Sequence, residues 1–314
     1  MKNIITITLN PAFDLHYYLD KFEKDKENYV RSVCCDAGGK GVNISRALSV
    51  MGVQSTAFIV LGNENGAEFA RQLEADGISF SPLLISGRVR ENITLHPDND
   101  RETRISLDSF SIGKDTLDEL FARISEHITE GTLVSFSGRI PKGVEKSDII
   151  SFLLNIKSLG ARLVVDSNSL TVDDLKKIKP FLIKPNDQEI ASLLGRDVKE
   201  LKDAAECAKA LARGGVAEQV MISLGERGAV WSDGIRTLSV SCPAIKSPVS
   251  TIGAGDSTVA GFIAATAAKL DTGTTLRCSS AFGTASCMTE GTRPPRPEDV
   301  REMFARITVS EVLE

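Results

Sequence analysis

Short β-rich runs alternate with helical patterns along most of this 314-residue chain, and this alternation limits the possible folds more than any other feature of the sequence. A strand, a helix and a second strand in succession form a parallel pair, and repeated units of this kind build a sheet with helices on both faces. We therefore predict a three-layer α/β/α sandwich with a mostly parallel central sheet, whose ligands lie beyond the carboxyl ends of the strands. The expected strands are 4–9, 56–61, 133–136, 162–165, 181–183 and 219–223, and the expected helices are 42–51, 67–75, 117–128, 149–159, 187–194 and 204–212.

Two segments, residues 16–35 and 88–107, interrupt the alternation of strands and helices, because they show little helical periodicity and contain alternating runs such as residues 90–96. We expect them to form a small separate β-sheet. The chain would then be one domain, 1–314, with lid segments near 13–35 and 87–108 inserted in the α/β body. A lid of this kind excludes water from a reacting centre, and its unpaired strand edges could join a second copy of the chain into a homodimer.

The composition excludes several classes of protein. Lysine and arginine number 37 against 42 aspartate and glutamate, and the net charge of −5 argues against binding nucleic acid through bulk electrostatics. The six cysteines include no Cys-x-x-Cys pair, and His16, His96 and His127 lack metal-ligand spacing, so we expect reduced thiols and no transition-metal site. Residues 1–9 alternate like a strand and no apolar run is long enough to cross a bilayer, so we expect a cytoplasmic protein without a signal peptide.

Residues 251–257 read Thr-Ile-Gly-Ala-Gly-Asp-Ser and open the most apolar helical stretch of the chain. The amides of Gly253, Ala254 and Gly255 would be free at the start of a helix, where the helix dipole favours an anion. Asp256 could simply cap that helix. However, placing a carboxylate at the start of so apolar a helix costs free energy, so we expect Asp256 to have a functional role. The motif suits phosphoryl transfer, with Asp256 as the base for an attacking hydroxyl and the three amides around the migrating group.

A second glycine cluster, residues 37–43, reads Ala-Gly-Gly-Lys-Gly-Val-Asn and leads into a helix. It is not a Walker A motif, because Lys40 is followed by glycine and position 34 is not glycine. Glycines allow a ligand to approach the backbone closely, Lys40 offers a cation, and Asn43 can pair with a sugar hydroxyl.

These motifs resemble those of the ribokinase-like sugar kinases called the phosphofructokinase B family. Residues 37–43 and 251–257 are similar to the first and second family signatures, in the same order. Four further stretches agree, namely 8–14 (Thr-Leu-Asn-Pro-Ala-Phe-Asp), 184–189 (Lys-Pro-Asn-Asp-Gln-Glu), 223–228 (Ser-Leu-Gly-Glu-Arg-Gly) and 291–292 (Gly-Thr). The resemblance spans nearly the whole chain and implies the ribokinase-like sandwich with a β-sheet lid. It also implies an enzyme that uses ATP and Mg²⁺ to phosphorylate a sugar.

The resemblance assigns roles to the residues at matching positions. Asp14 is expected to bind sugar hydroxyls, and Gly38, Gly39, Lys40 and Asn43 to complete the sugar pocket. Asn186 and Glu189 are expected to organise Mg²⁺, through water as this ion prefers, although Glu189 could instead stabilise the first turn of a helix. The residues expected to line the ATP site are Lys184, Asn186, Ser223, Gly225, Gly228 and Thr251, with Gly283 and Ser286 nearer the adenine.

Within the family, residues 8–14 and 250–251 resemble the branch that acts on phosphorylated ketohexoses, particularly the 1-phosphofructokinases. Arg88 and Arg90 are then candidates for binding the phosphate already on the substrate, since the planar guanidinium binds phosphate through two hydrogen bonds. A solvated lid charge is the alternative for each. Relatives commonly read Ser-Gly-Ser-Leu-Pro where residues 137–141 read Ser-Gly-Arg-Ile-Pro. Arg139 would therefore add a phosphate contact or change the preferred sugar phosphate.

The sequence thus predicts ATP-dependent phosphorylation of the C6 hydroxyl of fructose 1-phosphate to fructose 1,6-bisphosphate. Tagatose-6-phosphate kinase and 6-phosphofructokinase activities share the same motifs and stay open as alternatives. A sugar-phosphate sensor on a kinase fold is an alternative without catalysis, for which a missing base or a damaged anion site would be the sign. Asp256 and its glycines are intact.

Overall fold

The computed structural model describes residues 3–98, 100–198, 200–245 and 247–312. Helices and strands alternate through the first two thirds of the chain, and helices predominate after residue 253. In chain order the elements are β1 (Ile4–Thr8), β2 (Ala12–Leu19), β3 (Ser32–Gly38), α1 (Lys40–Val50), β4 (Thr56–Gly62), α2 (Gly66–Ala75), β5 (Ser79–Ile85), β6 (Arg90–Pro97), β7 (Thr103–Ser106), α3 (Lys114–Ser125), β8 (Leu133–Ser137), α4 (Lys146–Ser158), β9 (Arg162–Asp166), α5 (Val172–Ile178), β10 (Leu182–Ile183), α6 (Asp187–Leu194), α7 (Leu201–Arg213), β11 (Gln219–Ser223), η1 (Gly225–Arg227), β12 (Ala229–Ser232), β13 (Thr237–Ser241), α8 (Ala254–Ala267), α9 (Thr272–Ser286), α10 (Pro297–Arg306) and β14 (Thr308–Glu311).

The central sheet has ten strands in the order β14-β13-β12-β11-β10-β9-β8-β1-β4-β5. Every neighbouring pair from β5 to β11 is parallel, whereas β11 to β14 pair antiparallel at one edge. Strands β1 and β8 lie inside the parallel part of the sheet and are buried along their whole length, as expected for parallel strands covered on both faces. The prediction of a mostly parallel sheet is confirmed.

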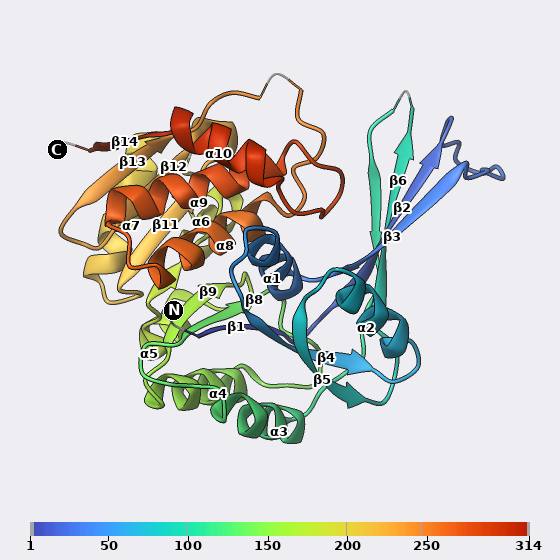
Figure 1. Ribbon diagram of the computed structural model, residues 1–314, viewed down its shortest axis with the longest axis horizontal. Helices are drawn as coiled ribbons and strands as arrows, with labels where there is room; N and C mark the ends of the chain where they lie inside the picture. The colour runs from blue at the N-terminus through green and yellow to red at the C-terminus, as the bar shows by residue number, and fades with distance from the viewer. Residues whose placement is uncertain (1–2, 99, 199, 246, 313–314) are drawn as a thin grey trace.

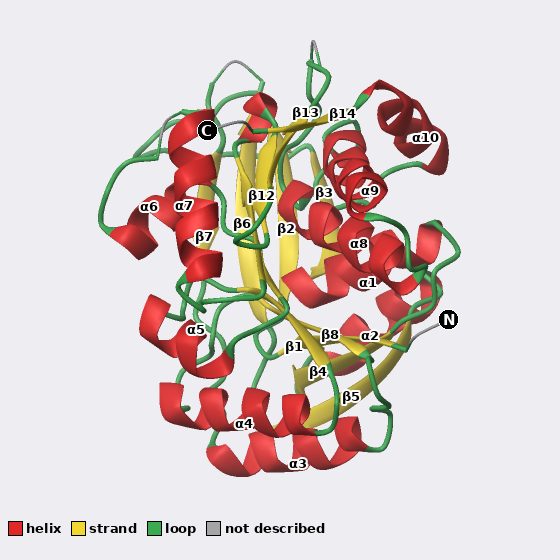
Figure 2. Ribbon diagram, turned by 90° about the vertical axis from the view of Figure 1, so that its left-hand side faces the viewer, coloured by secondary structure: helices red, strands yellow, loops and turns green. Residues whose placement is uncertain are grey.

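Two layers of helices cover the two faces of this sheet (Figure 2). Helices α1, α8, α9 and α10 share one hydrophobic cluster, which includes Ile4 and Val164. Helices α3 to α7 contribute to the other cluster, which includes the next residues along the same strands, Ile5 and Val165. Because successive side chains of a strand point to opposite faces, the two clusters are the two interfaces of a three-layer α/β/α sandwich.

The smaller sheet has the order β3-β2-β6-β7 and projects from the body (Figure 1). It comes from the two segments that the sequence analysis assigned to a lid. Strand β2 begins earlier than predicted, at Ala12, and β3 extends to Gly38, so that Asp14 lies within this sheet. We call this four-stranded sheet the lid sheet.

The predicted helices are all present, but several begin up to one turn earlier than the apolar pattern indicates. Helices α1, α3, α4 and α7 begin at Lys40, Lys114, Lys146 and Leu201. The first turn of a helix is commonly polar or half-exposed, so an apolar periodicity detects only the turns that follow it. The sequence analysis did not assign α5, α9, α10, β5 or the antiparallel strands β12 to β14.

Helices α8 and α9 pack closely at Gly261, where an added Cβ would lie 2.6 Å from the Cys278 carbonyl oxygen and 2.9 Å from the Ser279 Cα. Gly261→Ala must push two backbones apart, so we expect it to lower the free energy of unfolding by about 1–3 kcal/mol. The matched control is Gly113→Ala, because no atom lies within 4 Å of a Cβ at Gly113. We expect that change to stay within about 0.5 kcal/mol of the unchanged protein in urea unfolding. Equal losses in the two variants would contradict this description of the α8–α9 contact.

Candidate active site

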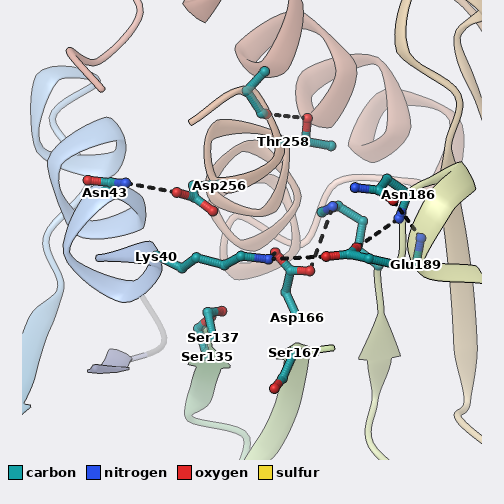
Figure 3. Close-up of polar contacts among 12 residues, drawn as sticks. Lys40, Asn43, Ser135, Ser137, Asp166, Ser167, Asn186, Glu189, Asp256 and Thr258 are labelled. Carbon is teal, nitrogen blue, oxygen red and sulfur yellow. Dashed lines mark hydrogen bonds and ion pairs between the residues drawn. The ribbon is translucent and has the colours of Figure 1, made fainter. Parts of the chain in front are cut away.

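The carboxyl ends of the central strands and the start of α1 bring four charged side chains together (Figure 3). Lys40 opens α1, and its Nζ lies 3.2 Å from Asp166 Oδ2 and 3.6 Å from Glu189 Oε1. Lys184 follows β10 and lies 3.8 Å from Asp166 Oδ1. Asp166 and Lys184 are buried. Burial alone would lower the pKa of Lys40, but the attraction of three carboxylates, Asp166 foremost, outweighs burial and raises it above its usual range.

A cleft of about 440 Å³ adjoins these residues. Its walls include Asp166, Lys184 and Glu189, together with Ser167 and Gln188. Asp256 is not part of its wall and lies on the α1 side of the charged group (Figure 3). The cleft therefore gives a ligand access to the charged centre from the side opposite Asn43.

The N-terminus of α8 points at the same centre. Gly253 is the N-cap with φ 78°, a left-handed conformation that favours glycine. The backbone amide of Ser257 donates to the Gly253 carbonyl at 2.9 Å, and this is the first regular hydrogen bond of α8. The Gly255 amide precedes it and therefore has no partner of this kind within the helix. The Ala254 amide donates to the Thr251 carbonyl at 3.4 Å. A Cβ at Gly255 would lie 3.4 Å from Lys184 Nζ, so a cation and a helix N-terminus meet there in a site suited to an anion.

Asp256 lies in the first turn of α8 and is only 6% exposed. Its Oδ2 accepts a hydrogen bond of 2.8 Å from Asn43 Nδ2 on α1. Burial raises the pKa of the Asp256 carboxyl to about 6, against the attraction of Lys40. A carboxyl that titrates near neutral pH beside an anion site has the properties of a general base.

Asn186 and Glu189 form a capping box at the start of α6. Asn186 Oδ1 accepts from the Glu189 amide at 2.7 Å, and Glu189 Oε2 accepts from the Asn186 amide at 3.0 Å. The capping alternative for Glu189 is therefore realised, but it occupies only one carboxylate oxygen. The other oxygen, Oε1, faces Lys40 and remains available to a cation. The amide oxygen of Asn186 is already engaged.

The lid sheet carries the second part of the site. Asp14 on β2 is 7% exposed and accepts a hydrogen bond of 2.9 Å from Asn92 Nδ2 on β6. Arg90 Nη1 donates to Asn92 Oδ1 at 3.0 Å, and Arg104 Nη2 on β7 lies 3.6 Å from Asp14 Oδ1. Gly38 lies against the same carboxylate, because a Cβ there would be 2.2 Å from Asp14 Oδ2.

Arg90 is the centre of a positive cluster. Burial lowers the pKa of Arg90, against the attraction of Asp14, and the charges of Arg139 and Arg104 lower it further. Its Nε is buried and has no hydrogen-bond partner within the described part of the chain. Arg88 is different, since it is 58% exposed on its side chain and faces Glu64 and Glu91 at 3.9 and 3.6 Å. Three arginines, Arg90, Arg104 and Arg139, therefore share a region that Arg88 does not.

The residues predicted for the nucleotide lie on several elements. Ser223 is bridged to Asn186, Gly225 opens η1, and Gly228 ends the same turn. Gly283 lies in the α8–α9 contact, and Ser286 is buried one turn further along α9. A Cβ at Gly283 would be 2.1 Å from Thr258 Oγ1, and Ser286, 2% exposed, donates to the Gly283 carbonyl at 2.8 Å. Thr251 and Gly39 are accessible beside the two glycine loops.

Asp166, Asn92 and Arg104 were not identified from the sequence. Asp166 follows a predicted strand directly, so the rule that ligands bind at carboxyl strand ends could have indicated it. Asn92 and Arg104 share the inner face of the lid sheet with Asp14, because Asn92 pairs with both Asp14 and Ser106. Only the strand register reveals that face.

Among the described residues, no helix is long and apolar enough to cross a membrane. All six cysteines are free. The described part of the chain also contains no group of three or more His, Cys, Asp or Glu residues with the geometry of a metal site.

Comparison with known proteins decides the family. Residues 5–299 match the pfkB family of carbohydrate kinases. The chain belongs to this family. It is 32% identical to the 1-phosphofructokinase of Borreliella burgdorferi over 98% of this chain and 99% of that protein, and 30% identical to the 1-phosphofructokinase of Escherichia coli over 89% of each. The crystal structure of phosphofructokinase-2 from Escherichia coli in complex with potassium superposes with a TM-score of 0.90 at 24% identity, covering 98% of this chain and 99% of that one. The protein is accordingly a sugar kinase with the fold of this family, and the predicted class of phosphotransferase is confirmed.

Asp256→Asn tests the electrostatic cost of the candidate base. The folded-state pKa of about 6 lies above the ordinary 3.8, so the free energy of unfolding falls as the pH rises between these two values. At pH 7 the carboxylate is ionised, and the full cost of burying its charge is present. A neutral amide removes the penalty. We expect kinase turnover to fall by at least about 100-fold while the free energy of unfolding at pH 7 rises by about 1–3 kcal/mol.

The matched control is Asp174→Asn. Asp174 belongs to the capping box of α5, where hydrogen bonds from Thr171 outweigh the effect of burial and lower its pKa. Its substitution should therefore reduce stability at pH 7 and leave turnover unchanged. Loss of stability in both variants at pH 7 would contradict the charge penalty at Asp256.

Proposed function

We propose that this kinase transfers the γ-phosphoryl group of ATP to the C6 hydroxyl of fructose 1-phosphate, giving fructose 1,6-bisphosphate. The observation that carries the proposal is the cluster of Arg90, Arg104 and Arg139 beside Asp14, because it provides a cationic site for a phosphate that the sugar already bears. The similarity to two 1-phosphofructokinases over at least 89% of each chain supports the choice of substrate.

In this proposal Asp256 takes the proton of the C6 hydroxyl as its oxygen bonds to the γ-phosphorus. The bond from that phosphorus to the bridging oxygen breaks, and ADP leaves with the electron pair. The amides of Gly253, Ala254 and Gly255, together with Lys184, stabilise the charge on the migrating group. Of the three amides, that of Ala254 already has a partner, the Thr251 carbonyl at 3.4 Å.

The sugar lies between the two glycine loops and the lid sheet. Asp14 holds its hydroxyls, with Gly38, Gly39, Lys40 and Asn43 around the ring. The distant phosphate binds to the arginine cluster and fixes the C6 hydroxyl in line with ATP. Binding energy from this remote group supports turnover as well as affinity, so free fructose should be a poor substrate in both respects.

ATP occupies the side of the α8 N-terminus toward β10 and β11. The residues proposed to line its site are Lys184, Asn186, Ser223, Gly225, Gly228 and Thr251, with Gly283 and Ser286 beyond them near the adenine. Close helix packing at Gly283 and the burial of Ser286 make an indirect, shape-setting role more suitable for those two residues than a direct contact.

Mg²⁺ fits the oxygen donors of the centre. Two lysines face three carboxylates there, so the site has no surplus positive charge to neutralise the phosphates of ATP. Glu189 Oε1 would hold the ion through water, and Asn186 would fix the orientation of Glu189. When bound, Mg²⁺ supplies charge neutralisation at the β- and γ-phosphates.

A substrate panel tests the proposal. Catalytic efficiency is measured by ATP consumption with fructose 1-phosphate, fructose 6-phosphate, tagatose 6-phosphate, ribose and adenosine. We expect fructose 1-phosphate to give the highest value. A higher catalytic efficiency with fructose 6-phosphate or tagatose 6-phosphate would identify that sugar as the substrate instead. Binding of a phosphoketose without turnover of any sugar would identify a sensor.

Arg139→Ser tests the phosphate site. A charge-assisted hydrogen bond contributes about 1.5–3 kcal/mol, so we expect the KM for fructose 1-phosphate to rise about 10- to 100-fold while the KM for ATP stays within about twofold. Arg88→Ser is the matched control, because Arg88 is exposed and paired with two glutamates, and its effect should be small. Steady-state kinetics of the two variants give the comparison. Unchanged kinetics in Arg139→Ser would remove Arg139 from the site.

We further propose that the outer face of the lid sheet binds a second copy of the chain. The face of the lid sheet opposite Asp14 is apolar. Strand pairing places Tyr17 beside Val33, Leu15 beside Ile93, and Ile93 beside Ile105 on this face. Val33 is 57% and Ile105 is 48% exposed. An apolar sheet face of this kind, with two free edges, favours association.

Val33→Glu should convert the dimer to a monomer, because a carboxylate on this face loses its hydration when the face is covered. Sedimentation at micromolar protein concentration measures the change in mass. Ile235→Glu is the control, since Ile235 is 85% exposed but lies far from the lid in sequence, and it should leave the mass unchanged. A monomeric parent protein, or an unaltered dimer in Val33→Glu, would contradict the proposal.

A further inference from the structure

Arg46 is a buried arginine of α1 that carries none of the roles assigned above. Its guanidinium is enclosed near the base of the lid sheet, with 6% of the residue exposed. It donates from Nε to Asp76 Oδ2 at 2.8 Å, from Nη2 to the Ala37 carbonyl at 2.7 Å, and from Nη1 to Asn43 Oδ1 at 3.3 Å. The three acceptors belong to different parts of the fold: Asn43 to α1 itself, Ala37 to the end of β3, and Asp76 to the C-terminus of α2. The guanidinium therefore links these segments in addition to pairing with one carboxylate.

The bond from Arg46 to Asn43 has a consequence for the orientation of the Asn43 side chain. An arginine has only donors, so it can face only the oxygen of the amide. The nitrogen of the same amide must then point the other way, where it donates to Asp256 Oδ2 at 2.8 Å. With Arg46 absent, the amide could turn over and present its oxygen to the carboxylate.

We propose that Arg46 is a positioning residue: it fixes the Asn43 amide so that Asn43 donates to Asp256 and favours its ionised form. The proposal rests on the proposed role of Asp256 as the base. Asp76 and Ala37 hold the guanidinium in place, and the Ala37 amide is itself held by Gln72 Oε1 on α2 at 2.6 Å. The end of β3 and the start of α1 are thereby fixed relative to the base.

In addition to the neutral amide of Asn43, several charged groups act on Asp256. Lys40 approaches it from α1 and Lys184 from the segment after β10, and both favour the ionised carboxylate. Asp166 at the end of β9 opposes them, as does burial. These groups are independent of Arg46, so a change at Arg46 should act on Asp256 through Asn43.

The test is the pH dependence of kcat/KM with the best substrate of the panel. In the unchanged protein activity should rise with pH through a midpoint near 6, because Asp256 must be ionised to act as a base. In Arg46→Met the midpoint should rise by about one unit, as expected for loss of a hydrogen bond to a charged group. The defect is then about fivefold at pH 6 and less than twofold at pH 8. The KM for ATP should be unchanged.

A double-mutant cycle separates positioning from a general structural effect. Asn43→Ala should raise the midpoint by a similar amount, and Arg46→Met should raise it no further in the Asn43→Ala protein. The control is Arg71→Met, which removes an exposed arginine that is paired with Glu68 on neighbouring α2. It should leave the profile unchanged. If Arg46→Met does not fold, Arg46→Lys replaces it, because a single ammonium nitrogen cannot reach acceptors that three separate guanidinium nitrogens contact.

A loss of activity that is uniform in pH, or that adds to the effect of Asn43→Ala, would overturn the proposal. The side-chain amide signal of Asn43 in ¹H–¹⁵N NMR gives a readout that needs no turnover. It should follow the titration of Asp256 in the unchanged protein and lose this dependence in Arg46→Met. An unchanged titration of that signal would refute the positioning role, whereas an inactive protein with the expected signal would refute only the proposed function.

Discussion

The active centre depends on the burial of one carboxylate at the start of an apolar helix. Asp256 is almost inaccessible to water, and its ionised form exists at neutral pH only because Asn43, Lys40 and Lys184 compensate the lost hydration. The same burial gives the carboxyl a pKa near neutrality, which makes it a stronger base than an exposed aspartate. Stability and chemistry are therefore opposed at this residue.

The elements around this carboxylate place charged groups and a helix N-terminus close to it. Parallel strands bring Asp166 and Lys184 to one edge of the sheet, and the glycines before Asp256 open the N-terminus of α8 toward the same place. The lid sheet carries Asp14 together with Asn92 and Arg104, at the far side of the proposed sugar pocket. In the function proposed above, the body holds the phosphoryl donor and the lid holds the acceptor, and the chain belongs to the pfkB family of carbohydrate kinases.

Much of this arrangement was predictable from the sequence, because it rests on local signals. Alternation of strand and helix patterns indicated the layers, and the two glycine motifs indicated that helices α1 and α8 begin close to Lys40 and Asp256. Contacts between distant segments could not be read in the same way. Asn43 and Asp256 are 213 positions apart, and the pairing of Asp14 with Asn92 depends on the register of β2 against β6. The bonds of Arg46 belong to this second kind.

The Asn-x-x-Glu motif shows a further limit of sequence reasoning. Its spacing is equally that of a helix capping box and of a pair that organises a metal ion, and in the structure one oxygen of Glu189 caps α6 while the other faces Lys40. The capping interpretation is observed, and the free oxygen leaves the proposed metal role possible for Glu189. For Asn186 the amide oxygen is taken by the cap, so orientation of Glu189 is its principal contribution.

The central claim is that Asp256 is a buried carboxyl with a strongly raised pKa. It is tested most directly by ¹³C NMR titration of the aspartate carboxyl carbons, with the Asp256 signal assigned by its loss in Asp256→Asn. The account predicts a midpoint near pH 6. A midpoint at or below the ordinary aspartate value of about 4 would contradict it.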